Sequence, residues 1–127
     1  MARKLNMTGK VNSNLEGIVE LALSGKSDES QRVQAIVDTG YNGFLTLPIA
    51  IIRRLGLQRV AQSRGTLATG DQVWIDVYRG TVIWGKRKLP IDIDAAEGAP
   101  LLGMDLMREC QLYIDVRNGG RVEIKGP

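Results

Sequence analysis

The amino-acid sequence predicts an all-β fold, a small closed or partly open barrel that carries one or two short helices. Three observations predict it. Short apolar segments alternate with polar residues at a period of two, tight-turn residues separate these segments, and glycine makes up 15 of the 127 residues, above its usual share of ~7%. The length is that of one ordinary domain, so residues 1–127 are expected to form a single domain with its own core.

The first half of the chain is expected to contain a hairpin and a short helix. The predicted elements are strands at 15–23, 31–37 and 43–47 and a helix at 48–55. The turn-rich segment 25–30 joins the first two strands as an antiparallel pair. The helix is predicted because Pro48 is tolerated in a first helical turn and Gly56 ends the periodic pattern.

The second half of the chain is predicted to form three hairpins and a short apolar strand. The predicted elements are strands at 59–68, 72–78, 81–84, 89–94, 100–103, 111–116 and 121–125 and one or two helical turns at 104–110. Thr69-Gly70-Asp71 separates the first pair, and Gly70-Asp71 as the two central residues suits a tight primed turn. Residues 85–88 join the second pair, and Asn118-Gly119 joins the last.

Composition excludes several classes of chemistry. The chain has no histidine and one cysteine, Cys110, so it builds no Ser-His or Cys-His pair, no histidine metal site and no internal disulfide. We therefore expect neither a metal nor another cofactor. No segment approaches the ~20 apolar residues of a membrane span, and the N-terminus lacks the apolar core of a signal peptide. We expect a cytoplasmic protein that contacts no membrane.

The net positive charge of the chain is too small to predict a nucleic-acid partner. The net charge is only +3. Arg3-Lys4 and the run at 86–88 are short basic clusters without interleaved aromatic residues. We expect no nucleic-acid partner. A small basic β-barrel that binds nucleic acid stays open as a third class, and its affinity would fall steeply with salt.

Asp38-Thr39-Gly40 is the candidate site for chemistry. It directly follows the apolar run Ala35-Ile36-Val37, so the carboxylate stands on a turn at the end of a buried strand, where it is held rigidly and partly desolvated. Gly40 would permit an unusual backbone angle. The alternative is an ordinary Asx turn, in which Asp38 bonds to its own backbone. Taken by itself, the tripeptide favours that alternative.

Further motifs in the same order make the chain resemble the retropepsin-like aspartic proteases of clan AA. The resemblance rests on AIVDTG at 35–40, the following strand at 44–47, a hairpin tipped near 69–71, and Leu101-Leu102-Gly103 before a short helix, about sixty residues after the acid. It covers roughly residues 15–116. The segment DTGYNGFLTLP looks most like the small microbial, single-domain members of the group.

The resemblance implies a closed barrel that is active as a homodimer, and it assigns roles to particular residues. Asp38 would be the catalytic carboxylate, and Thr39 would hydrogen-bond across the dimer axis. Gly40 would line the cleft and offer its backbone to the substrate. The flap hairpin at Thr69, Gly70 and Asp71 would close over a bound peptide. The supporting element of Leu101, Leu102 and Gly103 would pack beneath the catalytic loop.

The residues themselves agree with such chemistry. Two carboxylates a few ångströms apart cannot both ionise easily, so they share one proton and supply a base and an acid for water attack on a peptide bond. The chain holds one Asp-Thr-Gly, so the second carboxylate must come from a second copy. We therefore expect an aspartic endopeptidase with peptide or protein substrates. The alternative is a catalytically silent protein- or peptide-binding module of the same fold.

Three further expectations concern single side chains. Tyr41 stands where family members usually carry a small residue, and a ring there would narrow or occupy the cleft. Asp92 and Asp94 share a strand face, and we expect them on the solvated outer surface rather than at a metal. Trp74 and Tyr78 also share a face, and we expect them to pack in the core or at an edge.

Overall fold

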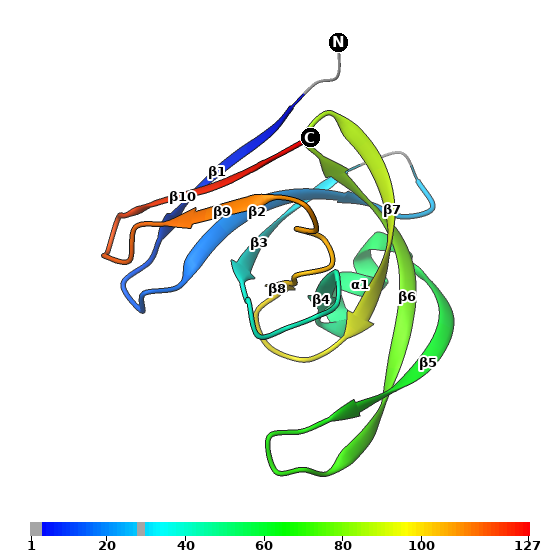
Figure 1. Cartoon of the computed structure of the whole chain (residues 1–127). Coiled ribbons are helices and arrows are strands. Elements are labelled where there is room, and N and C mark those ends of the chain that lie inside the picture. Colours follow the sequence, from blue (N-terminus) through cyan, green and yellow to red (C-terminus); the bar gives the residue numbers. More distant parts are fainter. Residues whose placement is uncertain (1–3, 28–29) are drawn as a thin grey trace.

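The computed structural model describes residues 4–27 and 30–127. This part of the chain forms ten strands and one short helix (Figure 1). In chain order they are β1 (Leu5–Val11), β2 (Gly17–Ser24), β3 (Gln31–Val37), β4 (Leu45–Leu47), α1 (Ile49–Leu55), β5 (Gln58–Thr66), β6 (Gln72–Trp84), β7 (Arg87–Ala95), β8 (Leu101–Leu102), β9 (Gln111–Ile114) and β10 (Arg121–Gly126). Arg3 of the basic pair, and Asp28 and Glu29 of the predicted turn, lie outside the described residues.

One curled sheet contains all ten strands, in the order β5-β6-β7-β4-β8-β3-β2-β1-β10-β9. β2 also pairs with β6, so the pairings run from β2 through β3, β8, β4 and β7 to β6 and return to β2. Most neighbours are antiparallel, whereas β3 with β8 and β4 with β7 are parallel. The predicted all-β class is confirmed, as is the antiparallel pairing of 31–37 with the preceding strand.

The core is formed by the inward-facing residues of the alternating strands. Every second residue of β2 is buried, including Val19, Leu21 and Leu23. The helix α1 adds Ile52 and Leu55, and it ends as predicted because Gly56 adopts the left-handed conformation, with φ of 65°. This core fixes β3, β4 and β8, the strands that carry or support the candidate site.

The structure differs from the sequence-based prediction at β1, at β6 and at the segment 104–110. β1 was not predicted, although its alternating residues Leu5 and Val11 are buried against β10 and β2. β6 is one strand of 13 residues rather than two, because Gly80 does not break it. Gly80 is buried where Leu57 and Ile93 pack, and a Cβ there would lie 2.8 Å from Cδ1 of Ile93.

The predicted helix at 104–110 is wrong. These residues form successive turns, and Glu109 has a positive φ of 65°, which breaks a right-handed helix. Leu106 and Met107 are nevertheless buried, so the segment still packs on the core. Within the described residues, the one helix, α1, has 7 residues and is too short to cross a membrane.

Candidate active site

Asp38 stands at the carboxyl end of β3, next to β8. Its backbone N–H donates to the carbonyl of Leu102 at 2.9 Å, which continues the parallel pairing of Ile36 and Val37 with Leu101 and Leu102. Leu102 is completely buried, whereas Asp38 is half-buried. The buried ladder therefore ends at a carboxylate that reaches the surface.

The carboxylate of Asp38 also organises its own turn. Its Oδ1 accepts a hydrogen bond from the N–H of Gly40 at 2.9 Å, and its carbonyl accepts one from the N–H of Tyr41 at 3.2 Å. This is the Asx turn named as the alternative interpretation. It uses Oδ1, and among the described residues Oδ2 makes no side-chain hydrogen bond. The turn therefore orients the carboxylate through one of its two oxygens.

Thr39 and Gly40 form the outer face of this turn. Both are exposed, and the Thr39 hydroxyl makes no hydrogen bond to any residue that the structure describes. The expectation of an unusual backbone angle at Gly40 is wrong, because its φ is not positive. A Cβ at Gly40 would instead lie 3.3 Å from Oδ1 of Asp38, so glycine keeps space beside the carboxylate.

Leu101-Leu102-Gly103 lies against the segment that follows Asp38. Beyond Leu102, the N–H of Gly103 donates to the carbonyl of Phe44 at 3.0 Å. The next two N–H groups continue this contact: that of Met104 donates to Tyr41 at 2.8 Å, and that of Asp105 donates to Gly43 at 3.1 Å. The structure thus brings together the predicted acid and the predicted supporting element.

A buried hydroxyl ties β8 to β4 below this contact. Thr46 is buried, and its Oγ1 accepts a hydrogen bond from the N–H of Leu101 at 2.9 Å. β8 pairs with β4 only at Leu102 and Leu45. The Thr46 hydroxyl therefore supplies a partner for a backbone donor that a two-residue strand would otherwise leave unpaired.

The Tyr41 ring packs within its own chain, beside the strands that carry the site. It lies against Gly43 and Gly103, and its hydroxyl donates to Oδ2 of Asp94 on β7 at 2.5 Å. Burial, and next the hydrogen bond to Asp94, raise the pKa of the Tyr41 hydroxyl above its ordinary value. Asp94 is on the expected face of β7, opposite the buried Ile93, but it is half-buried and not fully solvated. Asp92, by contrast, is exposed and pairs with Arg79 at 2.8 Å.

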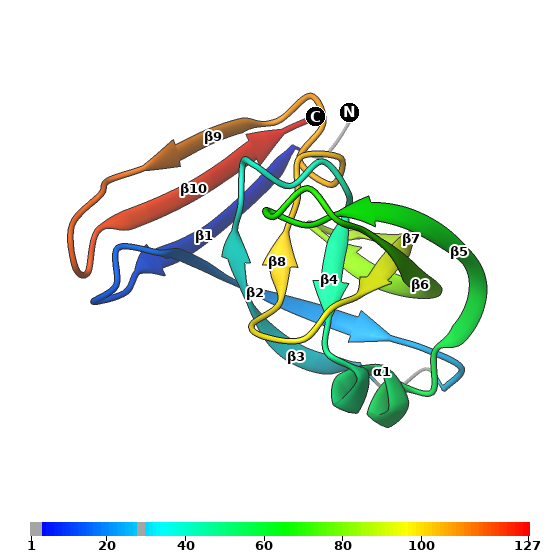
Figure 2. The same ribbon diagram turned by 90° about the horizontal axis from the view of Figure 1, so that it is seen from below.

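The hairpin of β5 and β6 projects from the body of the molecule (Figure 1) and crosses in front of the segment after β3 in Figure 2. Its loop spans 67–71, between the paired residues Thr66 and Gln72. The N–H of Leu67 donates to the carbonyl of Asp71 at 2.8 Å, so this pair encloses three residues, of which Gly70 has a positive φ of 89°. The predicted two-residue primed turn is therefore wrong. Thr69 Oγ1 instead donates to Asp71 Oδ2 at 3.1 Å, and all three predicted tip residues are exposed.

Large apolar side chains are exposed on the same hairpin. Trp74 is 65% exposed, so it does not pack in the core, whereas Tyr78 packs against the core as expected. The guanidinium of Arg64 lies over its ring, 5.2 Å from the centroid. Val60 and Leu67 are also exposed. The hairpin therefore presents apolar surface to solvent.

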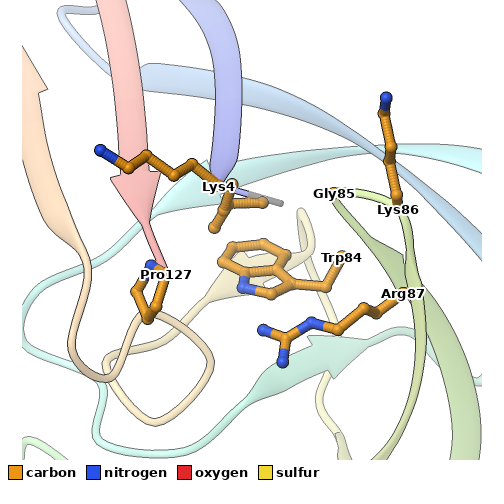
Figure 3. A pocket seen from close by; sticks show the side chains of 7 residues that line it. Lys4, Trp84, Gly85, Lys86, Arg87 and Pro127 are labelled. Atoms are coloured by element: carbon orange, nitrogen blue, oxygen red, sulfur yellow. The ribbon is translucent and has the colours of Figure 1, made fainter. Parts of the chain in front are cut away.

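A separate cavity of about 390 Å³ lies at the other end of β6, beside Trp84 (Figure 3). Lys4, Lys86 and Arg87 line it, and none of its lining side chains is acidic. In Figure 3 the amino groups of Lys4 and Lys86 point away from the indole. Among its lining side chains there is no carboxylate, hydroxyl or thiol, so the candidate site remains at Asp38.

Comparisons with known proteins identify the fold. No family model matches the sequence, and no curated protein matches it. Among solved structures, the chain is similar to a retropepsin-like aspartic protease from Rickettsia conorii, with a TM-score of 0.62 and 16% sequence identity. The match covers 99% of this chain and 94% of that one. The chain therefore has the fold of the retropepsin-like aspartic proteases.

Sequence reasoning missed the pairing of Tyr41 with Asp94. The two residues are 53 positions apart, and each has an ordinary alternative role when it is considered alone. Glycines at 43 and 103 were the available signal, because both stand where the tyrosine ring needs space. That signal becomes specific only when the fold brings the three positions together.

Proposed function

We propose that the protein is an aspartic endopeptidase that acts as a homodimer, with Asp38 of each copy forming the catalytic pair. The observation that carries the proposal is the place of Asp38, on an Asx turn at the end of β3 and hydrogen-bonded to Leu102. It stands in a chain whose whole length has a retropepsin-like fold. The proposal includes both the catalytic role of Asp38 and the association of two copies.

The surface around Asp38 supports a second copy as the source of the other carboxylate. Thr39 and Gly40 are exposed beside Asp38 and offer a polar, sterically open face. Two aspartates that the structure places near this segment already have partners: Asp94 accepts from Tyr41, and Asp105 pairs with Arg108 at 2.7 Å. A two-fold axis beside the Asp38 turn would bring two equivalent carboxylates together.

Such a pair hydrolyses a peptide bond without a cofactor. With one proton shared between the two groups, the ionised carboxylate takes a proton from water, and the water oxygen attacks the peptide carbonyl carbon. The protonated carboxyl polarises the carbonyl oxygen. The carboxyl that took a proton from water then gives one to the leaving nitrogen as the carbon–nitrogen bond breaks, which restores the singly protonated pair. The hairpin at 67–71, with its exposed apolar side chains, would cover the bound peptide.

Digestion of an unfolded protein between pH 3 and 8, with products identified by mass spectrometry, tests the proposal. We expect internal cleavage whose rate is bell-shaped in pH, because the base is lost when both carboxyls are protonated and the acid is lost when both are ionised. Chelators should leave the rate unchanged. An identically prepared Asp38→Asn protein controls for contaminating proteases. Absence of cleavage by the wild-type chain across the range would favour a peptide-binding module instead.

A further inference from the structure

The segment between Asp38 and β4 is anchored by a single aromatic side chain. The ring of Tyr41 fills the space above two glycines, since a Cβ would lie 2.6 Å from Cζ of the ring at Gly43 and 2.6 Å from Cδ2 at Gly103. Contacts this short do not occur between real side chains, so both positions need glycine for the ring to fit. The ring is thus confined on two sides by backbone.

The hydroxyl of the same residue reaches a third element. It donates to Oδ2 of Asp94 at 2.5 Å, and Asp94 pairs with Thr46 of β4 and with Val77 of β6. A short bond from a hydroxyl to a carboxylate is among the stronger hydrogen bonds in proteins. The hydroxyl is the donor in this bond, and burial together with the bond raises its pKa above the ordinary value. The carboxyl of Asp105 also contributes to this pKa.

We propose that Tyr41 is a positioning residue for Asp38, and that its hydrogen bond to Asp94 fixes the segment 38–44 to β7. The backbone connects the two directly. The N–H of Tyr41 donates to the carbonyl of Asp38, and the carbonyl of Tyr41 accepts from the N–H of Met104. A shift of the ring would therefore move the backbone that closes the Asp38 turn. The role in catalysis rests on the proposed function.

The Tyr41 side chain supports the Asp38 segment and does not obstruct the cleft. Asp94 and the two glycines hold the ring within its own chain, so the side chain acts as a support. Shrinking it to alanine would leave a void between Gly43 and Gly103 and a half-buried Asp94 without its donor. Such a variant is expected to lose activity, not to gain it.

The test uses Tyr41→Phe, which keeps the ring and removes only the hydroxyl, together with Asp94→Ala and Asp94→Asn. Hydrogen exchange of the amides at 39–44 reports on the anchoring without any need for activity. We expect exchange there to become about 10-fold faster in Tyr41→Phe and in Asp94→Ala. Asp94→Asn should exchange more slowly than Asp94→Ala, because its side-chain oxygen still accepts from the hydroxyl. The double variant Tyr41→Phe/Asp94→Ala should be no faster than either single variant.

Matched controls remove a tyrosine hydroxyl and a carboxylate at the surface. Tyr113→Phe changes an exposed tyrosine, and Asp92→Asn changes an exposed aspartate two residues from Asp94 on the same strand. Neither should alter exchange at 39–44. Wild-type exchange rates in Tyr41→Phe would overturn the proposal.

Kinetics separate a positioning role from a merely structural one. In Tyr41→Phe, kcat should fall about 10-fold with KM within about twofold, and the pH profile should shift because the two carboxylates no longer meet in the same geometry. Asp94→Ala should lose kcat to a similar extent, and Asp94→Asn should keep much more of the wild-type kcat than Asp94→Ala does. Faster exchange with unchanged kcat and pH profile would overturn the positioning role. If the wild-type chain cleaves nothing, the proposed function fails, and exchange alone then decides whether the bond holds the segment.

Discussion

Replacing Asp38 by asparagine is expected to lower the rate of peptide cleavage by about a thousandfold or more at the pH where the wild-type rate is highest. The substitution removes the ionisable group from both copies of a homodimer, so neither a base nor an acid remains in the pair. Asparagine is nearly the same size, and its side-chain oxygen can still accept the hydrogen bond from the N–H of Gly40. The turn should therefore keep its shape, and the loss should be chemical.

Two measurements test whether the loss in Asp38→Asn is chemical and not structural. Thermal unfolding of Asp38→Asn should match wild type within a few degrees, and its pH profile should be flat at the background rate. Asp92→Asn, an exposed aspartate that pairs with Arg79, should cleave at nearly the wild-type rate, because exposed ion pairs contribute little to stability. Equal cleavage by wild type and Asp38→Asn would contradict the role given to Asp38.

Replacing Gly103 by alanine is expected to lower the free energy of unfolding by about 3 kcal/mol. A Cβ at this position would run into the carbonyl oxygen of Gly43 and lie 2.6 Å from Cδ2 of Tyr41. The first contact is with backbone, which cannot rotate away, so β8 and the segment after Asp38 must separate. Their separation would weaken the hydrogen bonds from Gly103 to Phe44 and from Met104 to Tyr41.

Chemical denaturation of Gly103→Ala checks this result, and Gly40→Ala is the matched control. Gly40 is exposed, has no positive φ, and its Cβ would meet only the movable side-chain oxygen of Asp38, at 3.3 Å. We expect the control to lose less than about 1 kcal/mol of stability. If Gly103→Ala unfolds at the same denaturant concentration as wild type, β8 does not hold the Asp38 segment in the way described.

The elements that were predictable from sequence are those with a local signal. β3 was predicted with its observed bounds because its apolar residues alternate, and α1 was placed by Pro48 and Gly56. The position of Asp38 at the end of β3 follows from the same alternation. The division of β6 into two predicted strands was wrong, because Gly80 lies inside β6 and is packed against Leu57 and Ile93.

Contacts between distant parts of the chain were not predictable in the same way. No local pattern marks Asp94 as the acceptor for Tyr41, and alternation alone placed it on the solvated face beside Asp92. The exposure of Trp74 was also missed, because an aromatic residue in an alternating strand is more often packed. These side chains take their surroundings from the fold as a whole, which sets β7 beside β4 and projects the hairpin into solvent.

The central claim, that two Asp38 side chains act as one catalytic pair, is tested most directly by mixing wild type with Asp38→Asn. After subunit exchange at fixed total protein, with mixed dimers verified by native mass spectrometry, the cleavage rate is measured against the wild-type fraction. Because a mixed dimer carries one carboxylate, the account predicts that the rate falls as the square of that fraction. A rate that stays proportional to the amount of wild-type chain would contradict it, because each chain would then act alone.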